Sequence, residues 1–128
     1  MRPPARRFCM LAAMLLALAT AIGAVAAHAL RARLPPDRFE VLQTAVHYQF
    51  FHSLGLLGIG LLSDRWPQWS LTASGWLIVA GVTLFCGSLY ALLAGAPHAI
   101  GVLTPVGGLA LIAGWCLCAL ALWRERHG

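Results

Sequence analysis

FCMLAAMLLALATAIGAVAAHAL, residues 8–30, is longer than the roughly 20 apolar residues that a helix needs to cross a hydrocarbon core of about 30 Å. Three further apolar runs follow, at 41–62, 71–93 and 100–123, and none of the four holds Asp, Glu, Lys or Arg away from its edges. Polar and apolar residues do not alternate within them, which favours helices over the strands of a barrel. The sequence therefore predicts an all-α polytopic membrane protein, an antiparallel bundle of four transmembrane helices.

Composition supports the same class. The chain has 128 residues, of which 60% are hydrophobic and only 10% charged, and its mean hydropathy is +0.78. A soluble domain needs far more charge to cover its surface. We expect one domain, 1–128, with helices at about 8–30, 38–62, 71–94 and 100–123. All nine basic residues are arginines at the membrane edges. They suit headgroup contacts, so we expect the lipid bilayer, and not nucleic acid, as the partner.

The first apolar run resembles a signal peptide, because a basic segment precedes it and small residues end it. Two features favour its retention as a helix. The run is longer than the 7–15 apolar residues of a usual signal peptide. In addition, Ala19, Gly23 and Ala27 recur every four residues, a pattern suited to close packing of helices in lipid. We therefore expect an uncleaved first helix.

Arginines also indicate the orientation. Four spans place both termini and the second connection on one side of the membrane. Six arginines lie on that side and three, in the first connection, on the other. The positive-inside rule then places both termini in the cytoplasm of a bacterial inner-membrane protein. The six are Arg2, Arg6, Arg7, Arg65, Arg124 and Arg126.

Local signals predict where two of the helices begin. Asp37 followed by Glu40 resembles a capping box, which would start the second helix near Arg38. Thr104 followed by Pro105 resembles a cap and first helical position for the fourth helix. The stretch 95–101 would then be a partly irregular connection at the membrane edge.

Polar side chains within the spans gather in one half of the predicted bundle. Antiparallel threading places seven of them in the same half of the bilayer: His28, Tyr48, Gln49, His52, Ser88, Tyr90 and Thr104. Gln49 and His52 are three residues apart and share a helix face. An intramembrane ionisable group such as His52 is a candidate functional residue. The cluster is either a ligand-binding or proton site, or hydrogen-bonded glue between helices.

We expect no catalytic set, metal or other cofactor. His47 and His52 are five residues apart, not the three or four that align two metal ligands on a helix, and no carboxylate lies at depth. No nucleophile–base set, phosphate loop or pair of carboxylates can be assembled. The chain is therefore not expected to be an enzyme.

Several motifs, in order along nearly the whole chain, resemble the domain of unknown function 423 family, the YgdD-like small bacterial inner-membrane proteins. The motifs are GAVAAHAL at 23–30, TAVHYQFFH at 44–52, GSLY at 87–90, TPVGG at 104–108 and Gly114-Trp115. The resemblance implies four transmembrane helices and an uncleaved first helix. It brings no established activity.

Two functions stay open at this point. The first is a structural or accessory membrane protein that packs with itself or with a larger membrane-protein partner, as small-residue stripes and short connections suggest. The alternative is binding or transport of a small molecule, ion or proton through the polar cluster. Four helices enclose little space, so transport would require an oligomer.

Overall fold

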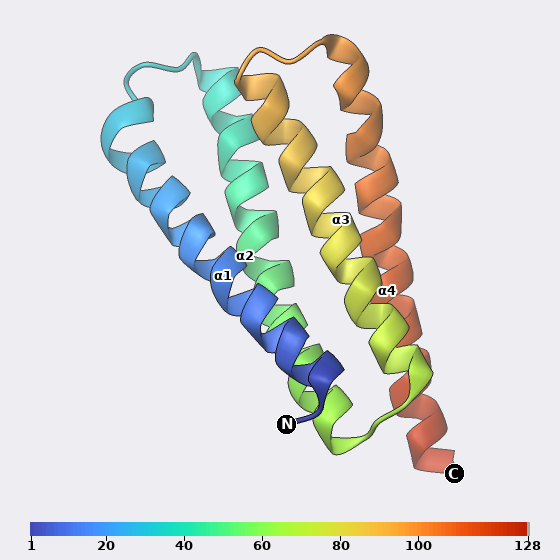
Figure 1. Cartoon of the computed structure of the whole chain (residues 1–128). Coiled ribbons are helices and arrows are strands. Elements are labelled where there is room, and N and C mark those ends of the chain that lie inside the picture. Colours follow the sequence, from blue (N-terminus) through green and yellow to red (C-terminus); the bar gives the residue numbers. More distant parts are fainter. Residues whose placement is uncertain (128) are drawn as a thin grey trace.

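The computed structural model describes residues 1–127, with side chains as far as Glu125, so the side chain of Arg126 in the charge count lies outside it. Four long helices fill this part of the chain (Figure 1). They are α1 (Pro3–Val25), α2 (Pro36–Arg65), α3 (Trp69–Leu93) and α4 (Leu103–His127). Two short helices adjoin them: the π-helix η1 (Ala26–Leu30) continues α1, and the 3-10 helix η2 (His98–Val102) precedes α4. Each is long and apolar enough to span a membrane.

Prolines occupy the first positions of two helices. Pro3 begins α1, well before residue 8, and Pro36 begins α2. A missing backbone N–H costs nothing at a first helical position. The predicted cap at Asp37 is wrong, because Pro35 takes the cap position and no side chain caps α2. Asp37 lies instead in the first turn, where its negative charge interacts favourably with the helix dipole.

The connection between α3 and α4 combines a turn with a short helix. Gly95 has a φ of 100°, in the left-handed region that favours glycine, and turns the chain after α3. The stretch 95–101 is partly irregular, as expected: 95–97 lies outside any helix, and His98–Val102 forms the helix η2. α4 then begins at Leu103, next to the predicted start at Thr104-Pro105.

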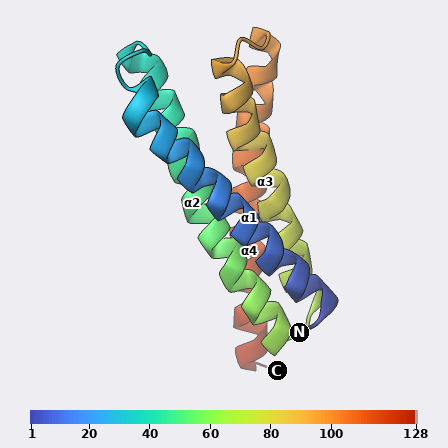
Figure 2. The same cartoon turned by 60° about the vertical axis from the view of Figure 1, so that its left-hand side comes forward.

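The helices run antiparallel, with both termini at one end of the molecule (Figure 1). The predicted all-α, four-helix architecture is confirmed. α1 packs mainly on α2 and α4 mainly on α3, while α2 against α3 joins these two hairpins. Figure 2 shows that the hairpins cross near the termini and diverge toward the end that holds the connections at 31–35 and 94–97. We refer to these two parts as the terminal half and the loop half.

The buried apolar side chains form two clusters, one toward the termini and one in the loop half. The larger one includes Phe8, Leu56 and Ile78, which are fully buried side chains from α1, α2 and α3. The smaller one, centred on Leu42 and Val46, lies in the loop half and receives side chains mainly from α1 and α2. The core is therefore shared by several helices toward the termini and belongs mainly to one hairpin at the other end.

Glycines bring α3 and α4 into close contact. A Cβ atom added to Gly107 would lie 2.4 Å from the backbone nitrogen of Phe85 and 2.9 Å from the carbonyl oxygen of Gly81. One added to Gly114 would lie 2.9 Å from Ile78. These glycines therefore allow the backbones of α3 and α4 to approach closely.

Candidate functional site

One chain of hydrogen bonds ties three helices together. The Tyr90 hydroxyl of α3 donates to Oε1 of Gln49 on α2 at 2.7 Å. Nε2 of Gln49 donates in turn to the carbonyl oxygen of Leu15 on α1 at 2.8 Å. Gln49 is only 2% exposed, so both bonds satisfy a polar group that is buried in the protein. These two members of the predicted cluster link helices.

A second pair links α3 to α4. The hydroxyls of Ser88 and Thr104 share a short hydrogen bond, and Ser88 also donates to the carbonyl oxygen of Phe85. Closer to the termini in the same helix pair, the Ser74 hydroxyl donates to the carbonyl oxygen of Gly114 at 2.7 Å. Ser74, Ser88 and Thr104 therefore make their hydrogen bonds within the α3–α4 hairpin.

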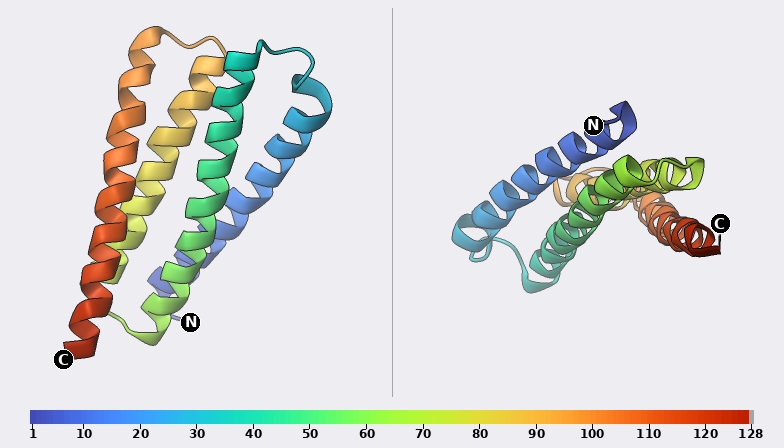
Figure 3. Two further views of the ribbon diagram at one scale, coloured as in Figure 1. Left: turned by 180° about the vertical axis from the view of Figure 1, so that it is seen from behind. Right: turned by 90° about the horizontal axis from the view of Figure 1, so that it is seen from below.

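Tyr48 and His52 turn to another face of α2. They stack on each other with ring centroids 5.5 Å apart, and Tyr48 also stacks on Phe85 at 4.3 Å. The ring of His52 lies 6.1 Å from that of Trp115 on α4. Together these four side chains line a hollow of about 510 Å³ between α2 and α4. The left panel of Figure 3 shows α3 running behind α2 and α4.

The hydrogen bond of His52 fixes the roles of its ring nitrogens. Nδ1 lies 2.8 Å from the carbonyl oxygen of Tyr48, which can only accept, so Nδ1 is the donor. In the neutral ring Nε2 is then an acceptor. No hydrogen-bond partner reaches Nε2 among the residues that the structure describes. A polar acceptor thus belongs to the wall of the α2–α4 hollow.

The seven predicted residues form three pairs with one left over. Gln49 and Tyr90 are bonded together, whereas Tyr48 and His52 stack beside the α2–α4 hollow. Ser88 and Thr104 form the pair between α3 and α4. His28 is exposed on η1. The structure therefore distributes the seven residues over several contacts without joining them in one site.

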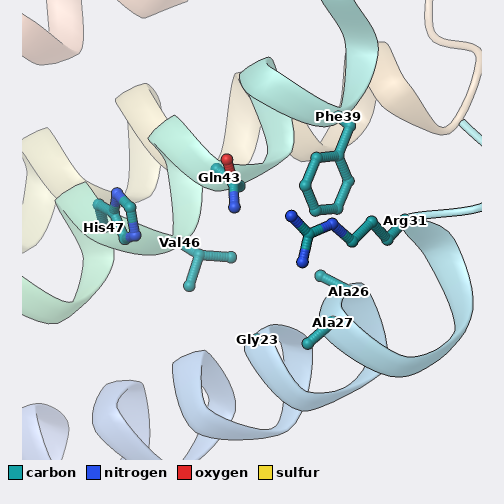
Figure 4. Close-up of a pocket in the computed structure, with 8 residues that line it drawn as sticks. All are labelled: Gly23, Ala26, Ala27, Arg31, Phe39, Gln43, Val46 and His47. Carbon is teal, nitrogen blue, oxygen red and sulfur yellow. The ribbon is translucent and has the colours of Figure 1, made fainter. Parts of the chain in front are cut away.

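A separate pocket opens between α1–η1 and α2 in the loop half (Figure 4). One wall holds small residues four apart, Gly23 and Ala27, and ends at Arg31. The opposite wall holds three residues of α2 that are also four apart. Side chains four apart lie on one helix face, so two helix faces meet across the hollow. We name this cavity of about 120 Å³ the Arg31 pocket; its α2 wall is Phe39, Gln43 and His47.

The π-helix leads directly into the charged residue of the pocket. The amide of Arg31 donates to the carbonyl oxygen of Ala26 at 3.0 Å, which closes the wide turn of η1. The guanidinium carbon then lies 5.9 Å from the centre of the Phe39 ring, a cation–π contact. Figure 4 shows the Arg31 side chain extended from η1 toward α2. Single π turns are rare and occur frequently at functional sites.

The sequence motifs do not indicate this pocket. Arg31 is a topology signal by its position, and no motif singles out Phe39 or Gln43. The four-residue spacing of positions 23, 27 and 31, and of 39, 43 and 47, was the available signal. For metals, no group of three or more His, Cys, Asp or Glu within the described part of the chain is placed to hold an ion.

Comparison with known proteins gives the family. The model of the DUF423 family, described as a protein of unknown function, matches residues 22–108. The chain belongs to this family. The segment that matches the DUF423 model contains the whole of the Arg31 pocket and both hydrogen-bonded pairs, Gln49–Tyr90 and Ser88–Thr104.

Curated relatives of this DUF423 protein are membrane proteins by name. The chain is 38% identical over 115 residues to the UPF0382 membrane protein YwdK of Bacillus subtilis, an alignment that covers 89% of this chain and 94% of the relative. It is 36% identical over 117 residues to a UPF0382 membrane protein of Staphylococcus haemolyticus, covering 91% and 95%. It is 33% identical over 111 residues to the UPF0382 inner membrane protein YgdD of Escherichia coli, covering 84% and 82%.

No solved structure matches the chain. With four apolar helices and relatives that are membrane proteins, this DUF423 protein is an integral membrane protein of uncharacterised activity, as the sequence predicted. The family resemblance carried by the motifs is confirmed.

Proposed function

We propose that this protein is a non-catalytic structural or accessory component of the bacterial inner membrane, which packs with a second copy of itself or with a larger membrane-protein partner. The observation that carries this proposal is the hydrogen bonding of His52. Its imidazole has an unpartnered acceptor nitrogen, among the described residues, and lines a hollow of about 510 Å³ on the α2–α4 face. His52 lies near the middle of α2 and therefore deep in the membrane. Its acceptor nitrogen gains a hydrogen bond if a donor from another protein enters the hollow.

The hydrogen bonds inside the molecule support the same function. Gln49, Tyr90, Ser88 and Thr104 make their bonds with one another and with backbone carbonyls. Bonds of this kind stabilise the arrangement of the helices. They favour a scaffold that offers a fixed face to a partner over the binding or transport of a small molecule.

The surroundings of His52 also suit a helix of another protein. Gly58 and Ala119 line the continuation of the hollow toward the terminal half, beside Trp115, whereas Gly55 is already covered by the Trp115 ring. Small residues allow a second backbone to approach closely. Trp115 beside them offers a large apolar surface and an N–H donor.

For the orientation, we propose that both termini face the cytoplasm. The termini share one end of the molecule, and six of the nine arginines belong to that side. Trp66 and Trp69 flank the connection between α2 and α3 at the same end, as expected of residues at a membrane interface.

Replacement of His52 by leucine tests the function. We expect His52→Leu to weaken association in lipid nanodiscs by about fivefold, the effect of one intramembrane hydrogen bond of roughly 1 kcal/mol. The readouts are energy transfer between labelled copies and capture of partners from native membranes that retain their lipids. The temperature of unfolding in detergent should stay unchanged.

Thr83→Val is the matched control. Thr83 is an exposed polar residue of α3 that bonds to its own helix, at the carbonyl oxygen of Val79, and it does not line the hollow. Its replacement should leave association unchanged. Equal association of the wild type and His52→Leu in both readouts would contradict the proposal. So would an unfolded His52→Leu protein, because His52 would then serve the stability of the bundle.

A further inference from the structure

The Arg31 pocket combines a cation with two further hydrogen-bonding side chains. Gln43 and His47 stand on the α2 wall, across from the helix that carries Arg31. The guanidinium contacts the Phe39 ring, and no carboxylate pairs with it among the described side chains. A guanidinium offers a planar set of N–H donors that matches phosphate oxygens two at a time. We propose that the Arg31 pocket binds the phosphate group of an anionic glycerophospholipid.

The nearby acids do not neutralise the pocket. Asp37 and Glu40 lie on the same stretch of α2 as Phe39, yet they line a different cavity together with Phe85 and Thr104. Those last two residues belong to α3 and α4, so that cavity opens on another side of α2. An anion that enters the Arg31 pocket therefore meets an unpaired positive charge.

The size of the pocket suits one phosphate group. Its volume is about 120 Å³, several times the roughly 10–15 Å³ that one water molecule needs, so a group larger than water, such as a phosphate, can enter. The acyl chains of a lipid would then lie outside the pocket, against the apolar surface of α1 and α2.

Depth in the membrane favours a lipid over a soluble ligand. α2 has 30 residues and is therefore about 45 Å long, the thickness of a bilayer with its headgroups. Its first turn, which includes Phe39, and the end of η1 at Arg31 then lie at the level of the headgroups. Gln43 and His47 follow one and two turns deeper, about 6 and 12 Å below Phe39. Their side chains lie where the ester groups of a bound lipid would be.

The small residues on the other wall keep the space open. A Cβ atom added to Gly23 would lie 3.6 Å from Val46, which is an ordinary contact. Glycine is therefore not required there for close packing of the two helices. Its effect is to leave room beside Ala27 for an occupant.

The test compares Arg31 with Arg33, an arginine of the same connection that is exposed, as Arg31 is, but does not line the pocket. Wild type, Arg31→Gln and Arg33→Gln are titrated with phosphatidylglycerol in detergent, and bound lipid is counted by native mass spectrometry. We expect Arg31→Gln to weaken binding about tenfold or more, as loss of a charge-assisted hydrogen bond implies. Arg33→Gln should change it by less than about twofold, since Arg33 lies outside the pocket and adds only to the net charge of the connection.

Two further titrations identify the source of the phosphate. Phosphatidylcholine, whose phosphate carries a compensating cation, should bind more weakly than phosphatidylglycerol. Soluble glycerol 3-phosphate should fail to displace phosphatidylglycerol. If it binds as tightly as the lipid, the lipid assignment is overturned.

The remaining outcomes also decide the question. Equal losses in Arg31→Gln and Arg33→Gln would show that the net charge of the connection attracts lipid and would overturn the pocket. Unchanged binding in Arg31→Gln would overturn it as well. If Arg31→Gln does not fold, Gln43→Leu replaces it, because Gln43 lines the pocket and is exposed. We expect a loss of about threefold there, and unchanged binding would count against the proposal.

Discussion

Small residues have opposite results at one site in each hairpin. In α3–α4, Gly81 faces Gly107, and the two backbones approach until no Cβ fits between them. In α1–η1 and α2, Gly23 and Ala27 face a wall of larger side chains and border a hollow of about 120 Å³. Small residues thus bring two backbones together at Gly81 and Gly107, whereas at Gly23 and Ala27 they leave room for an occupant.

The α3–α4 contact should be the most sensitive part of the molecule. In Gly107→Ala the new Cβ would lie 2.4 Å from the backbone nitrogen of Phe85, and the backbone cannot give way as a flexible side chain can. We expect a loss of about 3 kcal/mol in the free energy of unfolding, at the upper end for an overpacked core. Denaturation by SDS in mixed micelles measures it.

The adjacent glycine provides the control. A Cβ on Gly108 would meet the Phe85 ring at 3.8 Å, an ordinary contact. Gly108→Ala should therefore change the free energy of unfolding by less than about 1 kcal/mol. Similar losses in both variants would mean that any methyl group added to this stretch of α4 destabilises the protein, and that the close contact of Gly107 with Phe85 is not the cause.

Loss of the hydrogen bonds that link the two hairpins should have the next largest effect on the free energy of unfolding. Gln49→Leu removes the acceptor of the Tyr90 hydroxyl and the donor to the Leu15 carbonyl oxygen. Intramembrane hydrogen bonds contribute about 0.6 kcal/mol on average and up to roughly 1.7 kcal/mol. We expect a loss of about 1–2 kcal/mol in the free energy of unfolding, measured by the same denaturation.

A double-mutant cycle isolates this bond. Tyr90→Phe combined with Gln49→Leu should give a coupling energy of about 1 kcal/mol. Tyr48→Phe in place of Tyr90→Phe is the control, because the Tyr48 ring stacks on Phe85 and is not bonded to Gln49. Additive effects of Gln49→Leu and Tyr90→Phe would show that the bond contributes nothing to stability.

The architecture could be predicted from the sequence because the bilayer fixes the length of a span. Runs of more than about 20 apolar residues leave few alternatives to helices. The ends were harder to predict, since Pro3 and Pro36 start helices outside the apolar runs. Antiparallel threading needs only the order of the spans, and it placed Ser88 and Thr104, whose hydroxyls share a hydrogen bond, in the same half of the bundle.

The sequence could not give the rotation of each helix about its axis. Gln49 and His52 are three residues apart, yet Gln49 bonds to α1 and α3 while His52 contacts Trp115 of α4. Packing against neighbours decides such rotations. The Arg31 pocket was hidden for the same reason, because it depends on the π turn of η1 and on the face that α2 turns toward it.

The smallest expected effect is that of Gly23→Ala, which changes the volume of the Arg31 pocket without weakening the α1–α2 hairpin. Gly23→Ala adds a methyl group that meets Val46 at 3.6 Å, so it fits, and alanine is the better helix former. We expect the free energy of unfolding to rise by up to about 0.5 kcal/mol. Phosphatidylglycerol retention, counted by native mass spectrometry, should fall by about threefold, because the methyl group takes part of a cavity of about 120 Å³. A variant that is more stable and keeps its lipid would mean that the hollow beside Gly23 has no occupant, and a less stable one would mean that this hairpin closes on its glycine as α3–α4 does.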